Sequence, residues 1–184
     1  MRLDILDNVN LDDLTNQKNN IFEHVFYEFS MYHHTFFFLK RVIASDSTVF
    51  SDKQFWINVL LESHATHLRN LIHFFSSKDS MNGSTILKTN PKLGFSDDGK
   101  KTRIINHAIS HMDIERVDAS TGTDNLTVQI NELINSMYPE ICSRIRKYLN
   151  ELSNASSIND KYISEFYTPE IQERYKELLC MFSN

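Results

Sequence analysis

The sequence predicts an all-α protein, a helical bundle of four to five main helices with a long loop between the second and the third. Apolar residues recur every three or four positions over long segments, which is the spacing of one face of an α-helix. Only four glycines and three prolines interrupt 184 residues. We therefore expect a single helical domain over residues 1–184, with a core of about 14–152 and a C-terminal helix of about 168–182 packed on it.

Local signals place the ends of these helices. Thr168 before Pro169 marks the start of the last helix, because Pro is favoured at the first helical position. Pro139 should kink or split the fourth helix, since it removes a backbone donor. Polar and glycine-rich stretches predict loops at about Ser77–Gly99 and Ser153–Asp160. The expected helices span about Leu14–Ala44, Asp52–Phe75, Lys101–Ile114, Asn125–Leu152 and Thr168–Phe182.

Composition excludes several classes of protein. The net charge is −5, which argues against a surface dedicated to coating DNA. The longest apolar runs are far shorter than the roughly 20 residues of a membrane helix, and the N-terminal residues lack the apolar core of a signal peptide. Cys142 and Cys180 are too few for a disulfide framework or a thiolate metal site. We expect a soluble, cytoplasmic protein with no membrane partner.

The second helix carries the histidines that bear most on function. His64 lies in the middle of its apolar stripe, so we expect a hydrogen-bonded core histidine. His67 lies at the edge of the stripe, from which it could face a cleft between helices. Arg69 and His73 are four residues apart and therefore neighbours on the helix surface. A guanidinium can hold a phosphate while an imidazole transfers a proton; the alternative is a solvated face on which Glu62 pairs with Arg69.

The third helix suggests a metal site. His107 and His111 are four residues apart, so both imidazoles could reach one divalent transition-metal ion. A third ligand is required, and His67 is the candidate. The alternative is that both histidines flank the apolar stripe of this helix. Without that metal, no cofactor is expected.

Other polar groups are weaker candidates. His24 and Glu28 share a face of the first helix, yet we assign them to a mixed aromatic and polar surface. Lys101 and Arg103 could contact phosphates, although a solvated helix face is the usual arrangement for such a cluster.

Two segments resemble an uncharacterised family of small bacterial helical proteins. The stretch His67-Leu68-Arg69-Asn70-Leu71-Ile72-His73-Phe74-Phe75 is similar to that family's His-Ala-Arg-Asn-Leu-Leu/Ile-Asp-Phe-Phe motif. The stretch from Ile105 to Met112, followed by Arg116, is similar to its second motif. The resemblance covers about residues 50–117. The site residues that it implies are His67, Arg69, Asn70, His111 and Arg116.

More distantly, Arg69-Asn70-Leu71-Ile72-His73 resembles the Arg-(four to six residues)-His motif of HEPN domains in its Arg-Asn opening, with three residues in place of four to six before the histidine. Many HEPN proteins are dimeric ribonucleases of bacterial defence and stress systems, so this resemblance implies RNA and a second copy of the chain as partners. The order of His67, His107 and His111 is similar to the metal ligands of DinB-like four-helix bundles.

Three hypotheses follow. The first is a HEPN-like protein that binds or cleaves RNA, with catalytic candidates His67, Arg69, His73, His111 and Arg116 and substrate-binding candidates Asn70, Lys101 and Arg103. The second is a metal-binding bundle. The third is a non-enzymatic interaction module in which a buried polar network ties helices together. All three predict that the second and third helices pack together, with His67 or Arg69 near His111.

Overall fold

The computed structural model describes residues 20–46, 52–76, 83–88, 105–106 and 125–183 of the chain. These residues form an all-α bundle, as the sequence predicts, and the part described contains no strand. None of its helices is long and apolar enough to span a membrane. The long helices are α2 (Ile21–Ala44), α3 (Lys53–Phe75), α7 (Asn125–Leu152) and α9 (Pro169–Ser183).

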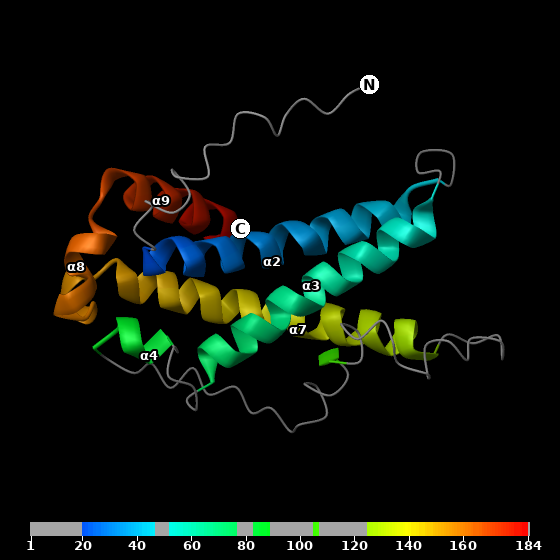
Figure 1. The fold of residues 1–184 in the computed structure, drawn as a ribbon, viewed down its shortest axis with the longest axis horizontal. Coiled ribbons are helices and arrows are strands. Elements are labelled where there is room, and N and C mark those ends of the chain that lie inside the picture. Colours follow the sequence, from blue (N-terminus) through cyan, green and yellow to red (C-terminus); the bar gives the residue numbers. More distant parts are fainter. Residues whose placement is uncertain (1–19, 47–51, 77–82, 89–104, 107–124, 184) are drawn as a thin grey trace, which may run out of the picture.

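Helices α2 and α3 form an antiparallel hairpin (Figure 1). The side chain of Asn20 caps α2 by accepting a hydrogen bond from the Phe22 amide at 2.9 Å. The same side chain donates to the Glu165 carbonyl at 3.1 Å, which ties the start of α2 to the C-terminal part of the chain. A cap of this kind supplies about 1 kcal/mol to a helix. The hairpin therefore has a fixed position in the bundle.

Helix α7 runs through Pro139 without being split. Packing on both sides of the proline holds the helix: Met137 and Ile141 are buried, and the Tyr138 ring stacks on Phe36 of α2 with centroids 3.7 Å apart. Of the two expected outcomes, a kink or a split, the split is wrong, because tertiary contacts outweigh one missing backbone donor.

Both predicted loops contain helix, which corrects the sequence-based expectation. Within the first, Gly83–Ile86 forms the short helix α4, and a β-bridge joins Leu87 to Ile158. Within and after the second, a 3-10 turn (η2, Ala155–Ser157) precedes helix α8 (Asp160–Phe166). These elements depend on contacts between distant segments, such as the hydrogen bond from the Asn159 amide to the Ile86 carbonyl at 2.8 Å.

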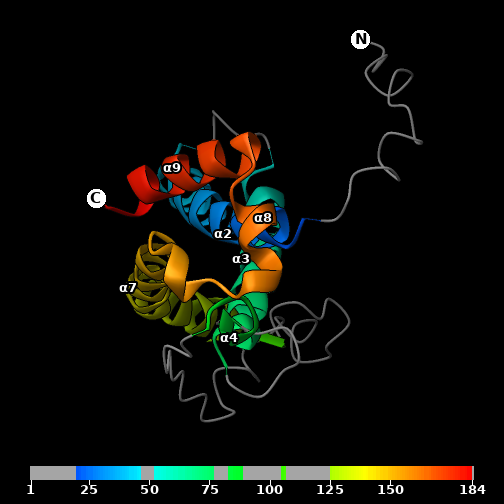
Figure 2. The ribbon, with the colours of Figure 1, turned by 90° about the vertical axis from the view of Figure 1, so that its left-hand side faces the viewer.

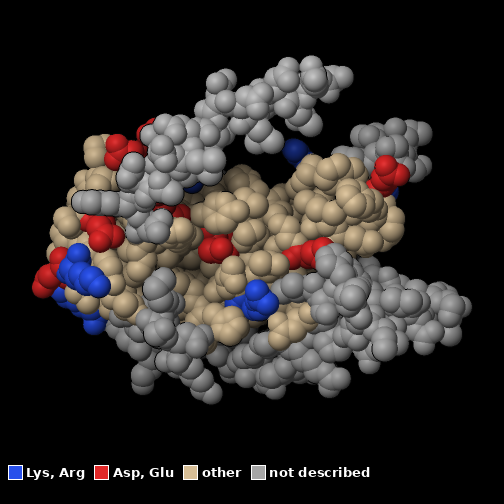
Figure 3. Space-filling model, viewed as in Figure 1, with Lys and Arg blue, Asp and Glu red and all other residues tan. Residues whose placement is uncertain are grey.

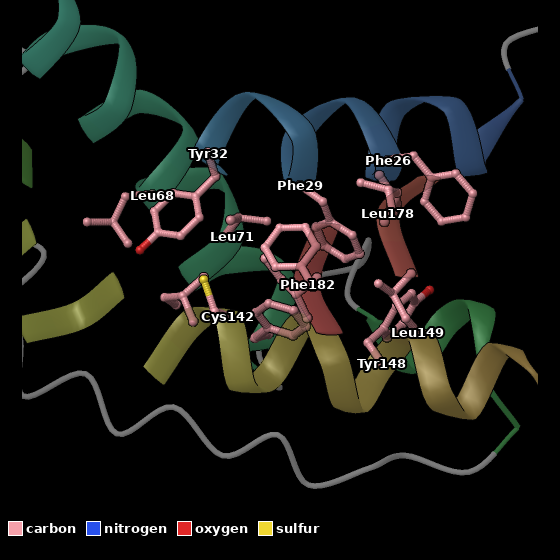
Figure 4. Close-up of a cluster of buried hydrophobic side chains, with 14 of the residues drawn as sticks. Phe26, Phe29, Tyr32, Leu68, Leu71, Cys142, Tyr148, Leu149, Leu178 and Phe182 are labelled. Carbon is pink, nitrogen blue, oxygen red and sulfur yellow. The ribbon is translucent and has the colours of Figure 1, made fainter. Parts of the chain in front are cut away.

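The core lies where α2, α3, α7 and α9 meet, and it is rich in aromatic rings (Figure 4). Phe29 is fully buried and stacks on Phe75, with centroids 6.1 Å apart. Tyr148 of α7 meets the edge of the Phe29 ring at 5.8 Å. Helix α9 lies over α2 and α7, and α8 covers one end of the bundle (Figure 2). Burial of these rings, at about 25 cal/mol per Å² of apolar surface, is the main favourable term for the fold.

Candidate functional site

Two histidines of α3 face α2, and the first of them is part of the core. His64 is fully buried, and its Nδ1 lies 2.9 Å from the Thr35 hydroxyl. That hydroxyl donates its own hydrogen to the Met31 carbonyl at 2.6 Å, so its lone pair accepts the hydrogen on His64 Nδ1. The prediction of a hydrogen-bonded core histidine is confirmed.

The surroundings of His64 keep it neutral. Its ring stacks on Tyr32 with centroids 4.6 Å apart. The pKa of His64 is lowered to about 3, mainly by burial and also by nearby His67, while a hydrogen bond to the Tyr32 backbone opposes the shift. His64 Nε2 has no hydrogen-bond partner among the described residues. At neutral pH this histidine therefore serves packing between α2 and α3.

The second histidine, His67, has a carboxylate partner. Its Nδ1 lies 2.8 Å from Glu28 Oε2 on α2, and the Asn70 amide donates to Glu28 Oε1 at 3.2 Å. Both oxygens of Glu28 thus accept hydrogen bonds from one face of α3. Because Nδ1 donates to the carboxylate, a neutral His67 carries its lone pair on Nε2. This arrangement fixes the orientation of Glu28, His67 and Asn70 together.

Beside this group, α2 and α3 line an open pocket of about 600 Å³. His24 and Glu28 lie one turn apart on α2, and Asn70 and His73 lie about one turn apart on α3, with Arg69 next to them. Helical spacing therefore gathers two imidazoles, a guanidinium, a carboxylate and an amide around one cavity. The α2/α3 pocket is lined by His24, Val25, Glu28, Phe29, Arg69, Asn70, Leu71, His73 and Phe74.

Arg69 is the cation of this pocket. The alternative arrangement, in which Arg69 pairs with Glu62, stays a prediction. On the face of the molecule seen in Figure 3, the Lys and Arg atoms that are drawn in blue form small separate groups. One guanidinium at this cavity suits one phosphate group.

The structure brings together four of the predicted site residues. Arg69, Asn70 and His73 line the pocket, and His67 holds the carboxylate that forms one of its walls. The remaining candidates lie outside the described residues: Lys101, Arg103, His107, His111 and Arg116. The approach of His111 to His67 or Arg69 therefore stays a prediction.

The metal hypothesis stays a prediction for the same reason. Two of its three ligands, His107 and His111, lie outside the described residues. Within the described part of the chain, no three His, Cys, Asp or Glu side chains are placed to hold one ion. His67 already binds Glu28 through Nδ1, so Nε2 is the atom with which it would ligate a metal.

Sequence reasoning missed Glu28 and His24 as site residues. The sequence assigns both to a mixed surface of the first helix, although their four-residue spacing places them on one face. The available signal was a second pair, Arg69 and His73, with the same spacing on the next helix. Two such pairs on the adjacent helices of a hairpin can face one another, but which faces meet depends on tertiary packing.

Comparison of this chain with protein-family models, with curated proteins and with solved structures finds no match. The features of the pocket itself are therefore the basis for a functional assignment.

Proposed function

We propose that the α2/α3 pocket binds a phosphodiester group of RNA and promotes its cleavage. The single observation that carries this proposal is that one cavity of about 600 Å³ is lined by the guanidinium of Arg69 and by two imidazoles, His73 and His24. Pockets of some 300–1,000 Å³ are typical for small ligands and nucleotides. The resemblance to HEPN domains around Arg69 and His73 points in the same direction.

The chemistry needs three groups, and the pocket offers all three. A base must take the proton of the ribose 2′-hydroxyl, which then attacks the adjacent phosphorus. An acid must give a proton to the 5′-oxygen as its bond to phosphorus breaks, so that the products are a 2′,3′-cyclic phosphate and a 5′-hydroxyl. A cation must stabilise the extra negative charge on the phosphorane. In this proposal one imidazole is the base, the other is the acid, and Arg69 is the cation.

His67 and Asn70 have a different part in this proposal. Both donate to Glu28, at 2.8 and 3.2 Å, and His67 is not among the residues that line the cavity. We assign them as positioning residues, which hold the carboxylate wall against α3. Glu28 would orient a substrate hydroxyl or an imidazole, because a carboxylate accepts several hydrogen bonds.

A non-enzymatic role is the second candidate, and the same polar contacts favour it. The pairs His67–Glu28 and His64–Thr35 cross the interface between α2 and α3. Polar contacts between two helices can specify their packing without any chemistry. In that case Arg69 and His73 would belong to an interaction surface.

Cleavage of a short single-stranded RNA with a fluorophore and a quencher at its two ends distinguishes these roles. We expect activity in the wild type and at least about a hundredfold loss in Arg69→Gln and in His73→Asn, since one general acid–base or electrostatic group contributes about 10²–10⁴-fold. Arg174→Gln, an exposed arginine of α9, is the matched control and should keep wild-type activity.

Two further measurements separate binding from cleavage. An RNA with 2′-deoxy sugars cannot be cleaved, so its affinity reports binding alone, and Arg69→Gln should weaken it while His73→Asn should change it little. Catalysis by two imidazoles also predicts a bell-shaped dependence of kcat/KM on pH. Neither cleavage nor binding of RNA by the wild type would refute the proposed function and leave the interaction module.

A further inference from the structure

A second surface lies along α2. None of its lining residues lines the α2/α3 pocket. Two hollows of about 840 and about 490 Å³ adjoin there, and both are lined by His33 and Phe37. We name this surface the α2 groove. Its apolar lining includes Phe37, Phe38, Val59, Leu60, Met181 and Phe182.

The α2 groove is unusually apolar for a surface in contact with water. Phe37 is 49% exposed and Phe38 is 43% exposed. Six of the eight large apolar side chains that are exposed in the described part of the chain lie at this end of the α2–α3 hairpin: Phe37, Phe38, Ile43, Phe55, Trp56 and Val59. Contiguous exposed apolar surface commonly marks a binding site.

The charged residues described in the lining of the α2 groove are all of one sign. They are Lys40, Arg41 and Arg146, and no Asp or Glu of the described residues lines either hollow. This is notable in a chain with a net charge of −5. An occupant should therefore be acidic and should carry large apolar side chains, because complementary charge raises both the rate and the specificity of association.

The chain itself contains a segment of that chemistry. Residues 3–14, Leu-Asp-Ile-Leu-Asp-Asn-Val-Asn-Leu-Asp-Asp-Leu, hold six large apolar residues, four aspartates and no lysine or arginine. The segment lies outside the described residues. It precedes α2 directly in the sequence, so its connection to the groove is short.

The connection is also long enough. His33 lies 13 residues after the cap residue Asn20, which corresponds to about 20 Å along α2 at a rise of 1.5 Å per residue. Six peptide units separate Leu14 from Asn20, and an extended chain of that length spans about 20 Å. Asn20 is itself fixed through its hydrogen bond to the Glu165 carbonyl. When extended, the connection therefore reaches the end of the groove at His33.

We propose that residues 3–14 bind the α2 groove of their own chain, with the aspartates facing Lys40, Arg41 and Arg146 and the leucines, isoleucine and valine on its aromatic wall. The segment covers an apolar surface that would otherwise be exposed. An acidic partner protein could reach the groove only by displacing it. This proposal is independent of the proposed action on RNA, because no residue of the groove lines the α2/α3 pocket.

Paramagnetic relaxation in the full chain tests the proposal. A nitroxide is attached at Asn8→Cys in a Cys180→Ser background, since Cys142 is buried and Cys180 is exposed. With ¹⁵N labelling, we expect strong broadening of the backbone amides of Phe37, Phe38 and Val59. Amides of α8, at the other end of the bundle (Figure 1), should stay sharp.

Charge reversal gives the matched comparison. The triple variant with Lys40→Glu, Arg41→Glu and Arg146→Glu should lower the ratio of bound to free segment about tenfold or more. Each lost surface charge pair contributes a small free energy of binding, and the three contributions add. The control reverses three exposed cations elsewhere, Lys161→Glu, Arg174→Glu and Lys176→Glu, which changes the net charge equally. This control should keep the broadening of the groove amides.

Three outcomes would overturn the proposal. The first is the absence of broadening at the groove amides. The second is broadening that disappears when the labelled chain is diluted into an excess of unlabelled chain, which would mean that a second copy supplies the segment. The third is an equal loss of broadening in both charge-reversed variants. Each readout is independent of RNA cleavage, so failure here and failure of the proposed function remain distinguishable.

Discussion

His64 and His67 lie three residues apart on α3, and both face α2, yet their surroundings differ completely. His64 stacks on Tyr32 in a closed aromatic shell, and its hydrogen-bond partner is a hydroxyl. His67 meets a carboxylate whose side chain is 26% exposed and which also lines an open pocket. The comparison shows that the partner and the access of solvent decide whether a histidine of this helix can take part in chemistry.

The two contacts also act together. Each crosses the interface between α2 and α3, and each requires one particular register of the two helices. An apolar stripe alone tolerates small shifts of one helix along another, whereas a shift by one turn would leave Glu28, His67 and Asn70 without their partners at a cost of about 1–3 kcal/mol for each buried group. The polar contacts therefore select one register.

The largest expected effect comes from Leu68, the fully buried residue next to His67 in the sequence. Leu68→Ala should lower the free energy of unfolding by about 2–5 kcal/mol, because it leaves a cavity in the core that both regions share. Urea denaturation followed by far-UV circular dichroism measures this. Val59→Ala, at a position 38% exposed on the same helix, should cost less than about 1 kcal/mol. Equal losses in the two variants would contradict a common core.

Low pH should reduce the free energy of unfolding through His64. The pKa of His64 is about 3 in the folded chain, below the ordinary value of 6.5, so the unfolded chain binds this proton more readily between these two values. The contribution of His64 is complete above pH 6.5 and is lost as the pH falls toward 3, by up to about 1.4 kcal/mol per pH unit. His64→Gln should flatten the dependence of the free energy of unfolding on pH. The exposed His34→Gln is the control, and parallel curves for wild type and His64→Gln would exclude this origin.

The nearly isosteric substitution Glu28→Gln should lower the free energy of unfolding. Glu28→Gln leaves one carbonyl oxygen to accept from His67 and Asn70, and its amide meets a donor. We expect a loss of about 1–3 kcal/mol in the free energy of unfolding, since hydrogen bonds to a charged acceptor are the stronger kind. The exposed Glu23→Gln on the same helix should stay within about 0.5 kcal/mol. An unchanged urea midpoint in Glu28→Gln would show that the contact does not hold the helices together.

The smallest effect is expected at a third imidazole contact, which joins α2 to α7. The Tyr138 hydroxyl lies 2.8 Å from His33 Nδ1, and both side chains are half-buried, so water can replace part of the lost bond. Tyr138→Phe should cost about 0.5–1.5 kcal/mol in the free energy of unfolding. Tyr167→Phe, at a position 48% exposed, provides the reference. A larger loss than that of Glu28→Gln would reverse the expected order.

The sequence predicted the long helices well because their signals are local. The expected segment Asn125–Leu152 coincides with α7, and the last helix begins at Pro169 as its Thr-Pro-Glu start indicates. Gly83 was interpreted as a loop residue, yet it lies in α4. A side chain at this position would come within 3.2 Å of the Tyr148 ring and 3.3 Å of the Phe74 ring. The glycine allows close packing against these rings, which no local pattern reveals.

Only the residues that α3 contributes to the candidate site could be predicted from the sequence. The spacing of Arg69 and His73 identified the contribution of α3, because neighbours four residues apart are a property of one helix. The contribution of α2 required knowing that Glu28 faces His67, and that depends on the rotation of one helix against another. Sequence periodicity gives the apolar face of each helix but not the polar residue that lies at its edge.

The position of Trp56 has an optical consequence. It is the only tryptophan of the chain, and it is 40% exposed near the start of α3. Tryptophan fluorescence will therefore report unfolding at the tip of the hairpin rather than in the core. Unfolding curves from fluorescence and from circular dichroism will coincide only if the tip and the core unfold together.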